Sequence, residues 1–164
     1  MINIKLFVTT PDGEPDLAFI PTRATDGSAG YDVRANIKQA FNLYPGDRTL
    51  IPLGFALDFS DDPNKAVLLL PRSGHGSKGI TLSNSPGLGD SDYQGQYKAS
   101  VFNTNRDGRP FTIRPGDRIA QLVLVPVLHE DFALQEEFAG HTERGEGGFG
   151  STDNPADEVE EPTE

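Results

Sequence analysis

The residue types best suited to chemistry gather near the carboxyl end, in the segment RGEGGFGST from Arg144 to Thr152. Its glycines leave backbone amides free to approach an anion closely, and the Arg144 guanidinium pairs well with phosphate oxygens. Phe149, between Gly148 and Gly150, can lie flat on a planar ligand. No Gly-Lys-Ser/Thr follows, so the segment is not a Walker loop. A flexible glycine-rich linker is the alternative interpretation.

A second candidate site follows the apolar run at residues 66–71. Arg72, Ser73 and Gly74 place a guanidinium, a hydroxyl and an unhindered backbone at a strand end, where they can cradle an anion. The alternative is a strand-terminating turn with an exposed arginine. Gln121 lies within a separate apolar strand, and a buried Gln needs polar partners. It is therefore either a structural strut or a ligand contact.

Acidic side chains provide a third group of candidates. Asp90 and Asp92 share one face if the chain is extended there, but they diverge on a turn. A carboxylate that faces a phosphate pocket can act as a base toward water or as an outer ligand of Mg²⁺. Tyr93 offers a ring for stacking on a base or sugar, and Asp32 is a further acid after a Ser-Ala-Gly turn. A tight hairpin capped by Asp side chains is the alternative.

The chain has 164 residues, with 18 Gly, 13 Pro, no Cys and a formal net charge of −11. Its length suits one domain. The lack of Cys excludes a disulfide framework, thiolate metal sites and a cysteine nucleophile. The acidic balance disfavours general binding of DNA or RNA, but it is compatible with a small nucleotide where arginines cluster. No apolar run approaches the ~18 residues of a membrane span, and the amino-terminal segment is not expected to be a signal peptide.

Turn signals punctuate the chain at short intervals, such as the PGD tripeptides at 45–47 and 115–117. Between the turns lie short stretches rich in apolar, β-branched and aromatic residues, at 2–8, 49–59, 66–70, 97–103, 111–113 and 119–128. They predict an all-β barrel or sandwich with at most one short helical turn, within Ser73–Gly79. The last stretch is apolar on both faces, so we expect one face to meet another subunit. Its Pro126 should lie at an edge or bulge.

Taken in order, five segments resemble the five motifs of the homotrimeric dUTPase family. They are SAGYDVRA (28–35), PRSGHGSKG (71–79), NSPGLGDSDYQGQ (84–96), PGDRIAQLV (115–123) and RGEGGFGST (144–152). Each motif alone is moderately specific, whereas five in this order and at these spacings are strongly specific. The resemblance covers most of the chain.

This resemblance implies a jelly-roll-like β-barrel that assembles as a homotrimer, with each active site shared between three subunits. We expect the barrel in residues 1–142, a mobile arm that closes over the ligand in 143–152, and a disordered acidic tail in 153–164. The tail has a single Val, no aromatic and no basic residue, which leaves it too little apolar surface to become ordered.

The resemblance also implies the reaction, the hydrolysis of dUTP to dUMP and pyrophosphate. This reaction limits uracil incorporation into DNA and supplies dUMP for thymidylate synthesis. In this assignment Asp90 is the base for the water that attacks the α-phosphorus. Asp32 contacts the hydration shell of Mg²⁺, which the substrate phosphates mainly hold.

The implied substrate contacts divide between the phosphates and the nucleoside. The phosphates are expected to meet Arg72, Ser73, Gly74, Gln121 and Arg144, and the uracil to meet Asn84, Gly87 and backbone groups near Leu88 and Tyr97. Tyr93 is expected to pack under the deoxyribose and to exclude a ribose 2′-hydroxyl. Phe149 is expected to stack on the uracil, with Gly148, Gly150 and Ser151 completing the arm.

Two positions depart from the motif patterns. Gly89 precedes Asp90, where the family carries a bulky aliphatic residue, so we expect lost packing under the hairpin and a looser backbone at Asp90. His75 takes a position that is usually aliphatic. Neither it nor His129 and His141 shows metal-ligand spacing, and none is assigned a catalytic role.

Two other functions stay open: a relative of dCTP deaminase, which shares the fold, and a binding or regulatory module that uses the nucleotide as a signal. The third and fifth motifs argue against the first, and the retained candidate catalytic side chains argue against a loss of activity. No membrane or nucleic-acid partner is expected. The expected location is the cytoplasm, of a bacterium or of a host cell if the gene is viral.

Overall fold

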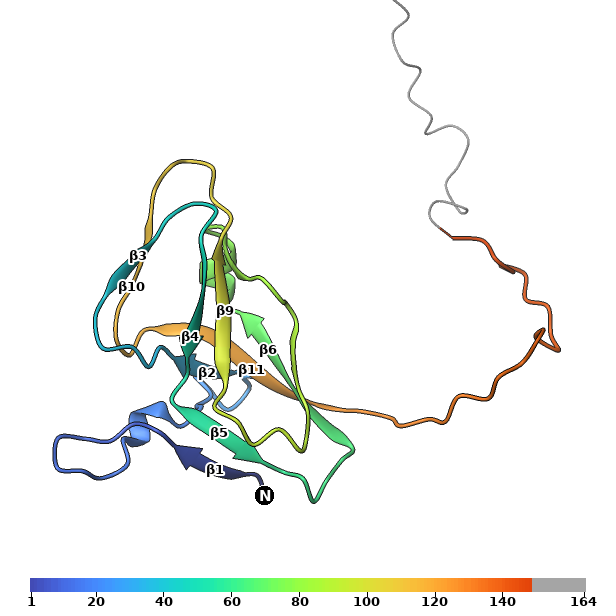
Figure 1. Cartoon of the computed structure of the whole chain (residues 1–164), viewed down its shortest axis with the longest axis horizontal. Coiled ribbons are helices and arrows are strands. Elements are labelled where there is room, and N and C mark those ends of the chain that lie inside the picture. The colour runs from blue at the N-terminus through green and yellow to red at the C-terminus, as the bar shows by residue number, and fades with distance from the viewer. Residues whose placement is uncertain (149–164) are drawn as a thin grey trace, which may run out of the picture. The chain divides into compact units, whose positions relative to one another are not determined.

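The computed structural model describes residues 1–148, and strands form nearly all of its regular structure (Figure 1). The strands are β1 (Asn3–Leu6), β2 (Tyr31–Arg34), β3 (Phe41–Leu43), β4 (Arg48–Pro52), β5 (Phe55–Asp58), β6 (Lys65–Pro71), β7 (Ile80–Leu82), β8 (Gly87–Gly89), β9 (Lys98–Asn103), β10 (Phe111–Ile113) and β11 (Arg118–Pro126). The predicted all-β class is confirmed.

The strands form small antiparallel sheets around one apolar core, in a jelly-roll-like arrangement. The largest sheet has the order β2-β11-β6-β8, and a second has the order β4-β9-β7. Two further pairs, β1-β5 and β3-β10, complete the framework. The long β11 therefore lies between β2 and β6. Its last residue, Pro126, pairs only with β6, because the β2 pairing ends at Leu122, which confirms the expected edge position.

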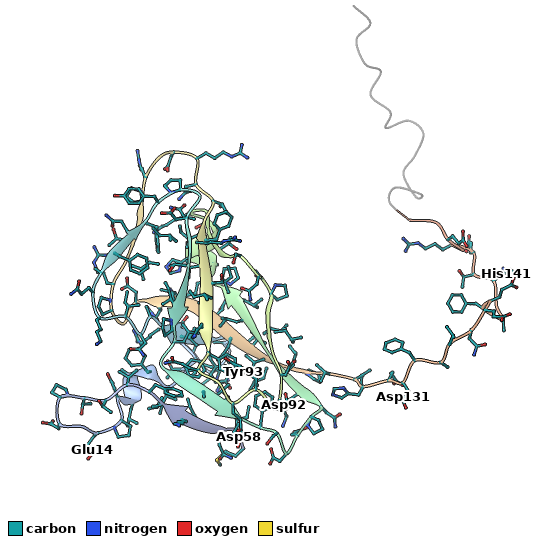
Figure 2. All side chains as sticks on the ribbon, in the orientation of Figure 1. Glu14, Asp58, Asp92, Tyr93, Asp131 and His141 are labelled. Atoms are coloured by element: carbon teal, nitrogen blue, oxygen red, sulfur yellow. The ribbon has the colours of Figure 1, made fainter. Side chains whose placement is uncertain are left out.

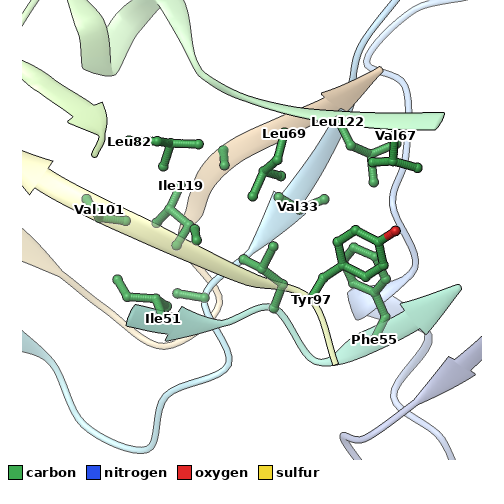
Figure 3. Close-up of a cluster of buried hydrophobic side chains, with 14 of the residues drawn as sticks. Val33, Ile51, Phe55, Val67, Leu69, Leu82, Tyr97, Val101, Ile119 and Leu122 are labelled. Carbon is green, nitrogen blue, oxygen red and sulfur yellow. The ribbon is translucent and has the colours of Figure 1, made fainter. Parts of the chain in front are cut away.

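The core is filled by apolar side chains from several sheets, among them Phe55, Ile51, Val101, Val33 and Leu122, which Figure 3 shows in one cluster. The strand predicted within 97–103 is present as β9, and every second residue of it, from Ala99 to Asn103, is buried. Burial of apolar area at roughly 25 cal/mol per Å² is the main force that holds these short strands together.

Three local features differ from the sequence prediction. The stretch 49–59 is not one strand: Gly54, at φ +80°, divides it into β4 and β5. A 3₁₀ helix at Leu17–Phe19 adds a second helical segment where at most one was expected, because Asp16 Oδ1 accepts a hydrogen bond from Ala18 N and caps it. The short strands β2, β3, β7 and β8 were not predicted.

The chain divides into two units by its contacts, Met1–His129 and the part that begins at Glu130. Residues 130–148 contain no strand or helix. Three of their large apolar side chains, Phe132, Leu134 and Phe138, are at least 88% exposed.

The helical turn predicted within Ser73–Gly79 is present as α1 (Ser73–Gly76). Over the part of the chain that the structure describes, no helix has the length and apolarity needed to cross a membrane.

Candidate active site

Sheet register brings together candidate residues from three different motifs. Asp32 on β2 pairs with Gln121 on β11, and Gln121 pairs with Leu70 on β6. Side chains of directly paired residues project from the same face of a sheet. Because β6 ends at Pro71, Arg72 emerges beside this row. Asp32, Arg72 and Gln121 therefore meet at one end of the largest sheet.

A cavity of about 580 Å³ opens at this end of the sheet. It is lined by Ala24, Ser28, Ala29, Gly30, Asp32, Arg72, Ser73, Gly74 and Gln121. The predicted phosphate contacts Arg72, Ser73, Gly74 and Gln121 thus share one cavity. Together they offer a guanidinium, a hydroxyl and a carboxamide, which are donors that suit phosphate oxygens.

Asp32, which lines this cavity, binds two arginines. Its Oδ1 accepts a hydrogen bond from Arg72 Nε at 2.8 Å, and its Oδ2 accepts one from an Arg118 guanidinium nitrogen at 3.0 Å. The Asp32 side chain is only 13% exposed. Such partly buried, charge-assisted contacts are stronger than exposed ion pairs. Asp32 therefore fixes the orientation of Arg72, while its contact with a magnesium hydration shell stays a prediction.

Gln121 is held in place by the backbone of β6. Its Nε2 donates to the Pro71 carbonyl at 3.0 Å, which satisfies the expectation that a half-buried Gln needs a polar partner. The Gln121 Oε1 lies 2.7 Å from the place that a β-carbon on Gly30 would take. A side chain at position 30 would displace the carboxamide, so this glycine keeps the cavity open.

His75, a residue of α1, contacts β10 and β11. Its ring meets Phe111 edge-on, with centroids 5.1 Å apart, and its Nδ1 lies 3.3 Å from the Ile119 carbonyl oxygen. Burial lowers the pKa of His75, so the neutral ring is favoured. It fills the place of the expected aliphatic residue as a packing group, in keeping with the absence of an assigned catalytic role.

The third motif forms a hairpin with a second cavity, of about 180 Å³. Its lining residues are Leu69, Asn84, Gly87, Leu88, Gly89, Tyr93, Tyr97 and Lys98. β8 pairs with β6 through Gly87 and Leu69, and both residues line this cavity. The predicted nucleoside contacts Asn84, Gly87, Leu88, Tyr93 and Tyr97 are therefore all in one place.

Tyr93, labelled in Figure 2, folds back over its own turn. Its hydroxyl donates to the Gln96 carbonyl at 3.1 Å. A β-carbon on Gly95 would lie 2.6 Å from the Tyr93 ring, so the ring needs this glycine beneath it. The side chain is thereby held as one wall of the hairpin cavity, the place expected for a residue that packs under the sugar.

The backbone groups of Tyr97 bind within the chain, and the expected contact between uracil and the backbone near Leu88 and Tyr97 stays a prediction. The Tyr97 backbone N–H donates to the Phe55 carbonyl and its own carbonyl accepts from Leu53 N, both at 2.9 Å. Because both backbone groups have these partners, the ring is what Tyr97 presents to the cavity. The expected packing loss at Gly89 is wrong, since the Tyr97 hydroxyl lies 2.6 Å from the place of a Gly89 β-carbon. The ring fills the space of the missing side chain.

Asp90 follows β8 directly and lines a separate cavity of about 510 Å³ with Ser91, Asp92 and Lys65. Its carbonyl accepts a hydrogen bond from Tyr93 N at 3.2 Å, which closes the turn. Among the described residues, the Asp90 carboxylate forms no ion pair. Its side chain is therefore free of the guanidinium contacts that engage Asp32.

One chain does not bring Asp90 and Arg72 together. Gly89 pairs with Val67, whereas Arg72 follows the opposite end of β6. The five steps along the chain from Val67 to Arg72 span roughly 16 Å at about 3.3 Å per strand residue. The two side chains also line different cavities. Within one copy of the chain, the two side chains therefore belong to separate places on the surface.

The last predicted site residues lie in the other unit. The Arg144 Nε donates to the Gly147 carbonyl at 2.8 Å, which forms a tight local turn with Gly145 at φ +53°. Gly148 is the last described residue. Phe149, Gly150 and Ser151 lie outside the described residues, so their predicted contacts stay predictions.

Sequence reasoning missed Arg118, although the fourth motif contains it. The residue binds Asp32 from the first motif, 86 positions away. Only the pairing of β2 with β11 reveals the contact, through the register Asp32 to Gln121. Leu69 and Lys98, which line the hairpin cavity, were also missed.

Comparison with known proteins gives consistent findings. The family model described as dUTPase matches residues 16–153. A deoxyuridine 5′-triphosphate nucleotidohydrolase of Escherichia coli (strain K12 / DH10B) is 54% identical over 132 residues, which cover 80% of this chain and 85% of that protein. The relative from Shigella boydii serotype 18 has the same identity and coverage.

Solved structures agree in fold. A mutant dUTPase of Staphylococcus bacteriophage 80alpha, in a structure with dUpNHpp, has a TM-score of 0.74 at 25% identity, and the match covers 93% of this chain and 98% of that chain. The dUTPase of Streptococcus mutans has a TM-score of 0.64 at 26% identity, over 79% of this chain and 98% of its own.

Proposed function

This chain belongs to the dUTPase family, and on that premise we propose that it hydrolyses dUTP to dUMP and pyrophosphate. The observation that carries the proposal is the convergence of Asp32, Arg72 and Gln121 on one cavity, together with a hairpin cavity that gathers Asn84, Tyr93 and Tyr97. The first cavity has the donors for phosphates, and the second has aromatic walls for a sugar and a base. The product dUMP would feed thymidylate synthesis, and removal of dUTP would limit uracil in DNA.

The phosphate side of the site is supported by charge. Arg72, Ser73 and Gly74 would bind the β-phosphate, and Gln121 would bind a phosphate oxygen or a bound water. Because Asp32 already holds Arg72, the guanidinium needs little reorganisation when the anion arrives. Arg144 would approach the γ-phosphate as the arm of residues 143–152 closes over the barrel of 1–142, in the manner of an arginine finger.

Asp90 would be the general base. Its carboxylate carries no guanidinium partner among the described residues, so it is available to accept a proton from water. The water oxygen would then attack the α-phosphorus, the bond from that phosphorus to the α–β bridging oxygen would break, and the β- and γ-phosphates would leave as pyrophosphate. Tyr93 would exclude a ribose by occupying the space of the 2′-hydroxyl. Phe149 would stack on the uracil.

The donor set fits a magnesium ion that the substrate itself brings. No group of three or more His, Cys, Asp or Glu side chains within residues 1–148 is placed to hold a metal. Mg²⁺ commonly keeps several waters and takes substrate phosphate oxygens as ligands. Asp32 would meet its hydration shell. When bound, the ion neutralises charge on the triphosphate, and the residues of this chain orient the phosphates and take the proton.

A homotrimer with shared sites would complete the constellation. Asp90 and Arg72 are separated along β6, so one copy would supply the base and another the phosphate contacts. Two further observations support association with other copies. Phe132, Leu134 and Phe138 are almost fully exposed, and Ile4, Tyr31 and Leu124 line an apolar groove on the Met1–His129 unit. Apolar surface of this kind favours burial against another subunit.

The direct test measures pyrophosphate release from dUTP, dCTP, dTTP and UTP. We expect turnover of dUTP only, and the Tyr93→Ala variant is expected to gain activity on UTP. Release of ammonia from dCTP would point to a deaminase instead. Tight dUTP binding without pyrophosphate release would point to a nucleotide-sensing module. The lack of Cys suits a reducing compartment, so we place the reaction in the cytoplasm.

A further inference from the structure

Tyr97 is the most deeply anchored side chain of the hairpin region. Its ring stacks on Phe55 with centroids 5.4 Å apart and an interplanar angle of 13° (Figure 3). Tyr97 is 6% exposed, and Phe55 is fully buried. Backbone hydrogen bonds to Phe55 and Leu53 fix its main chain as well. The ring is therefore a rigid extension of the core.

This ring contacts both flanks of Asp90. On one side, the Tyr97 hydroxyl and ring edge lie 2.6–3.1 Å from the place of a Gly89 β-carbon, so the ring covers the backbone just before Asp90. On the other side, the Tyr93 ring meets Tyr97 edge-on at 5.5 Å. Tyr93 in turn donates its backbone N–H to the Asp90 carbonyl. The turn that presents the carboxylate thus rests on one aromatic side chain.

Glycine at position 89 makes this arrangement possible. Gly89 does not have a positive φ, so its backbone conformation is open to other residues. What excludes a side chain is the Tyr97 ring, which is held by Phe55 and cannot easily move away. Position 89 can therefore be large only if position 97 is small, because both compete for the same volume.

We infer that Tyr97 is a positioning residue for Asp90. Gly89 and Tyr97 form a compensating pair, in which the large ring at position 97 fills the space left by the missing side chain at position 89. This packing sets the position of the catalytic carboxylate. The inference rests on the proposed function, since it concerns the base of that reaction. It predicts that either single change displaces the carboxylate. A displacement of about 1 Å can cost on the order of 10²-fold in rate.

The test is a double-mutant cycle with Gly89→Ile, Tyr97→Leu and the combined variant, measured as kcat and KM for dUTP. We expect each single variant to lose about 10²-fold in kcat, with a smaller change in KM. The combined variant should come within about threefold of the unaltered kcat, because the isoleucine fills the space that the leucine vacates. Tyr97→Phe, which keeps the ring, should retain at least about ten times the kcat of Tyr97→Leu.

Thermal unfolding of the same proteins separates positioning from general destabilisation. Ile113→Ala, which opens a cavity in the core away from the hairpin, should lower Tm and keep kcat. If a single variant does not fold, a folded and active combined variant still supports the pair. Additive losses in kcat, or a combined variant that does not fold, would overturn it. If the unaltered protein does not turn over dUTP, the proposed function is contradicted instead. Non-additive changes in Tm across the double-mutant cycle would then still report the packing of position 89 against position 97.

Discussion

The Asp32 carboxylate holds the Arg72 guanidinium at 2.8 Å, with the Nε of Arg72 as donor. The contact joins the first and second motifs, 40 positions apart. It turns an arginine at a strand end into a fixed element of the cavity. A flexible arginine would have to be ordered when the substrate binds, at a cost of up to about 2 kcal/mol in side-chain entropy.

Asp32→Asn is therefore expected to weaken binding of the triphosphate. A hydrogen bond to a charged group contributes about 1.5–3 kcal/mol, so KM for dUTP should rise by about tenfold or more. Inhibition by dUMP, which lacks the β- and γ-phosphates, should change much less. Asp107→Asn is the matched control, because the Asp107 to Arg109 pair is exposed and 3.9 Å long. Equal weakening of dUTP and dUMP would contradict the assignment.

Asp90→Asn should bind substrate and fail to turn it over. Loss of a general base typically costs 10²–10⁴-fold, so kcat should fall by at least about 10²-fold. Affinity for a non-hydrolysable dUTP analogue, measured by calorimetry, should stay within about threefold of the unaltered protein. Asp92→Asn is the control, since it removes a neighbouring carboxylate from the same turn. If both variants turn over normally, Asp90 is not the base.

Removal of the arm should lower kcat far more than removal of the tail. A chain that ends at Glu143 lacks Arg144 and Phe149, and we expect it to lose on the order of 10³-fold in kcat, as for other arginine fingers. A chain that ends at Asp153 keeps both residues and should remain nearly as active as the full chain. Pyrophosphate release from the two truncated proteins provides the comparison. Similar losses would contradict the assignment of residues 143–152 as the arm.

Stability at high pH should depend on Tyr97. Burial raises the pKa of its hydroxyl from 10.0 to about 12, and no protein group among the described residues hydrogen-bonds to it. Below pH 10 the hydroxyl is protonated in both states and the effect is absent. From pH 10 to about 12 only the unfolded chain releases the proton, so the free energy of unfolding should fall by up to about 1.4 kcal/mol per pH unit.

Denaturant unfolding across this pH range, compared with Tyr97→Phe, isolates the effect of that hydroxyl. The Phe variant should lose less stability as the pH rises. Tyr44→Phe removes a hydroxyl from an exposed ring and should behave like the unaltered protein. Identical pH profiles for the Tyr97→Phe variant and the unaltered protein would show that the hydroxyl is not buried in solution.

The sequence predicted the longer strands, because their signals are local. Alternation in β9 and the apolar run of β11 are visible along the chain. The short strand β8 was missed because its sequence, Gly-Leu-Gly, has no β-branched residue and depends on pairing with β6. The pairing of β8 with β6 depends on contacts between distant parts of the chain, which no local sequence pattern shows.

The site itself could be predicted by residue type more readily than by contact. Arg118 was missed because its role depends on the register between β2 and β11. Gly89 was misjudged for a similar reason. The sequence shows the missing side chain, but only the fold shows that Tyr97 reaches the same volume from eight positions away.

Mixing two inactive variants should restore activity if the sites are shared between copies. Asp90→Asn lacks the base and Arg72→Ala lacks the phosphate contact, so each alone should be nearly inactive. When the two are denatured and refolded together, some sites should take Asp90 from one copy and Arg72 from another. With random assembly, roughly a quarter of the sites should be intact. Each variant refolded alone is the control. Recovery no greater than in those controls would place both residues in one copy, against their separation along β6.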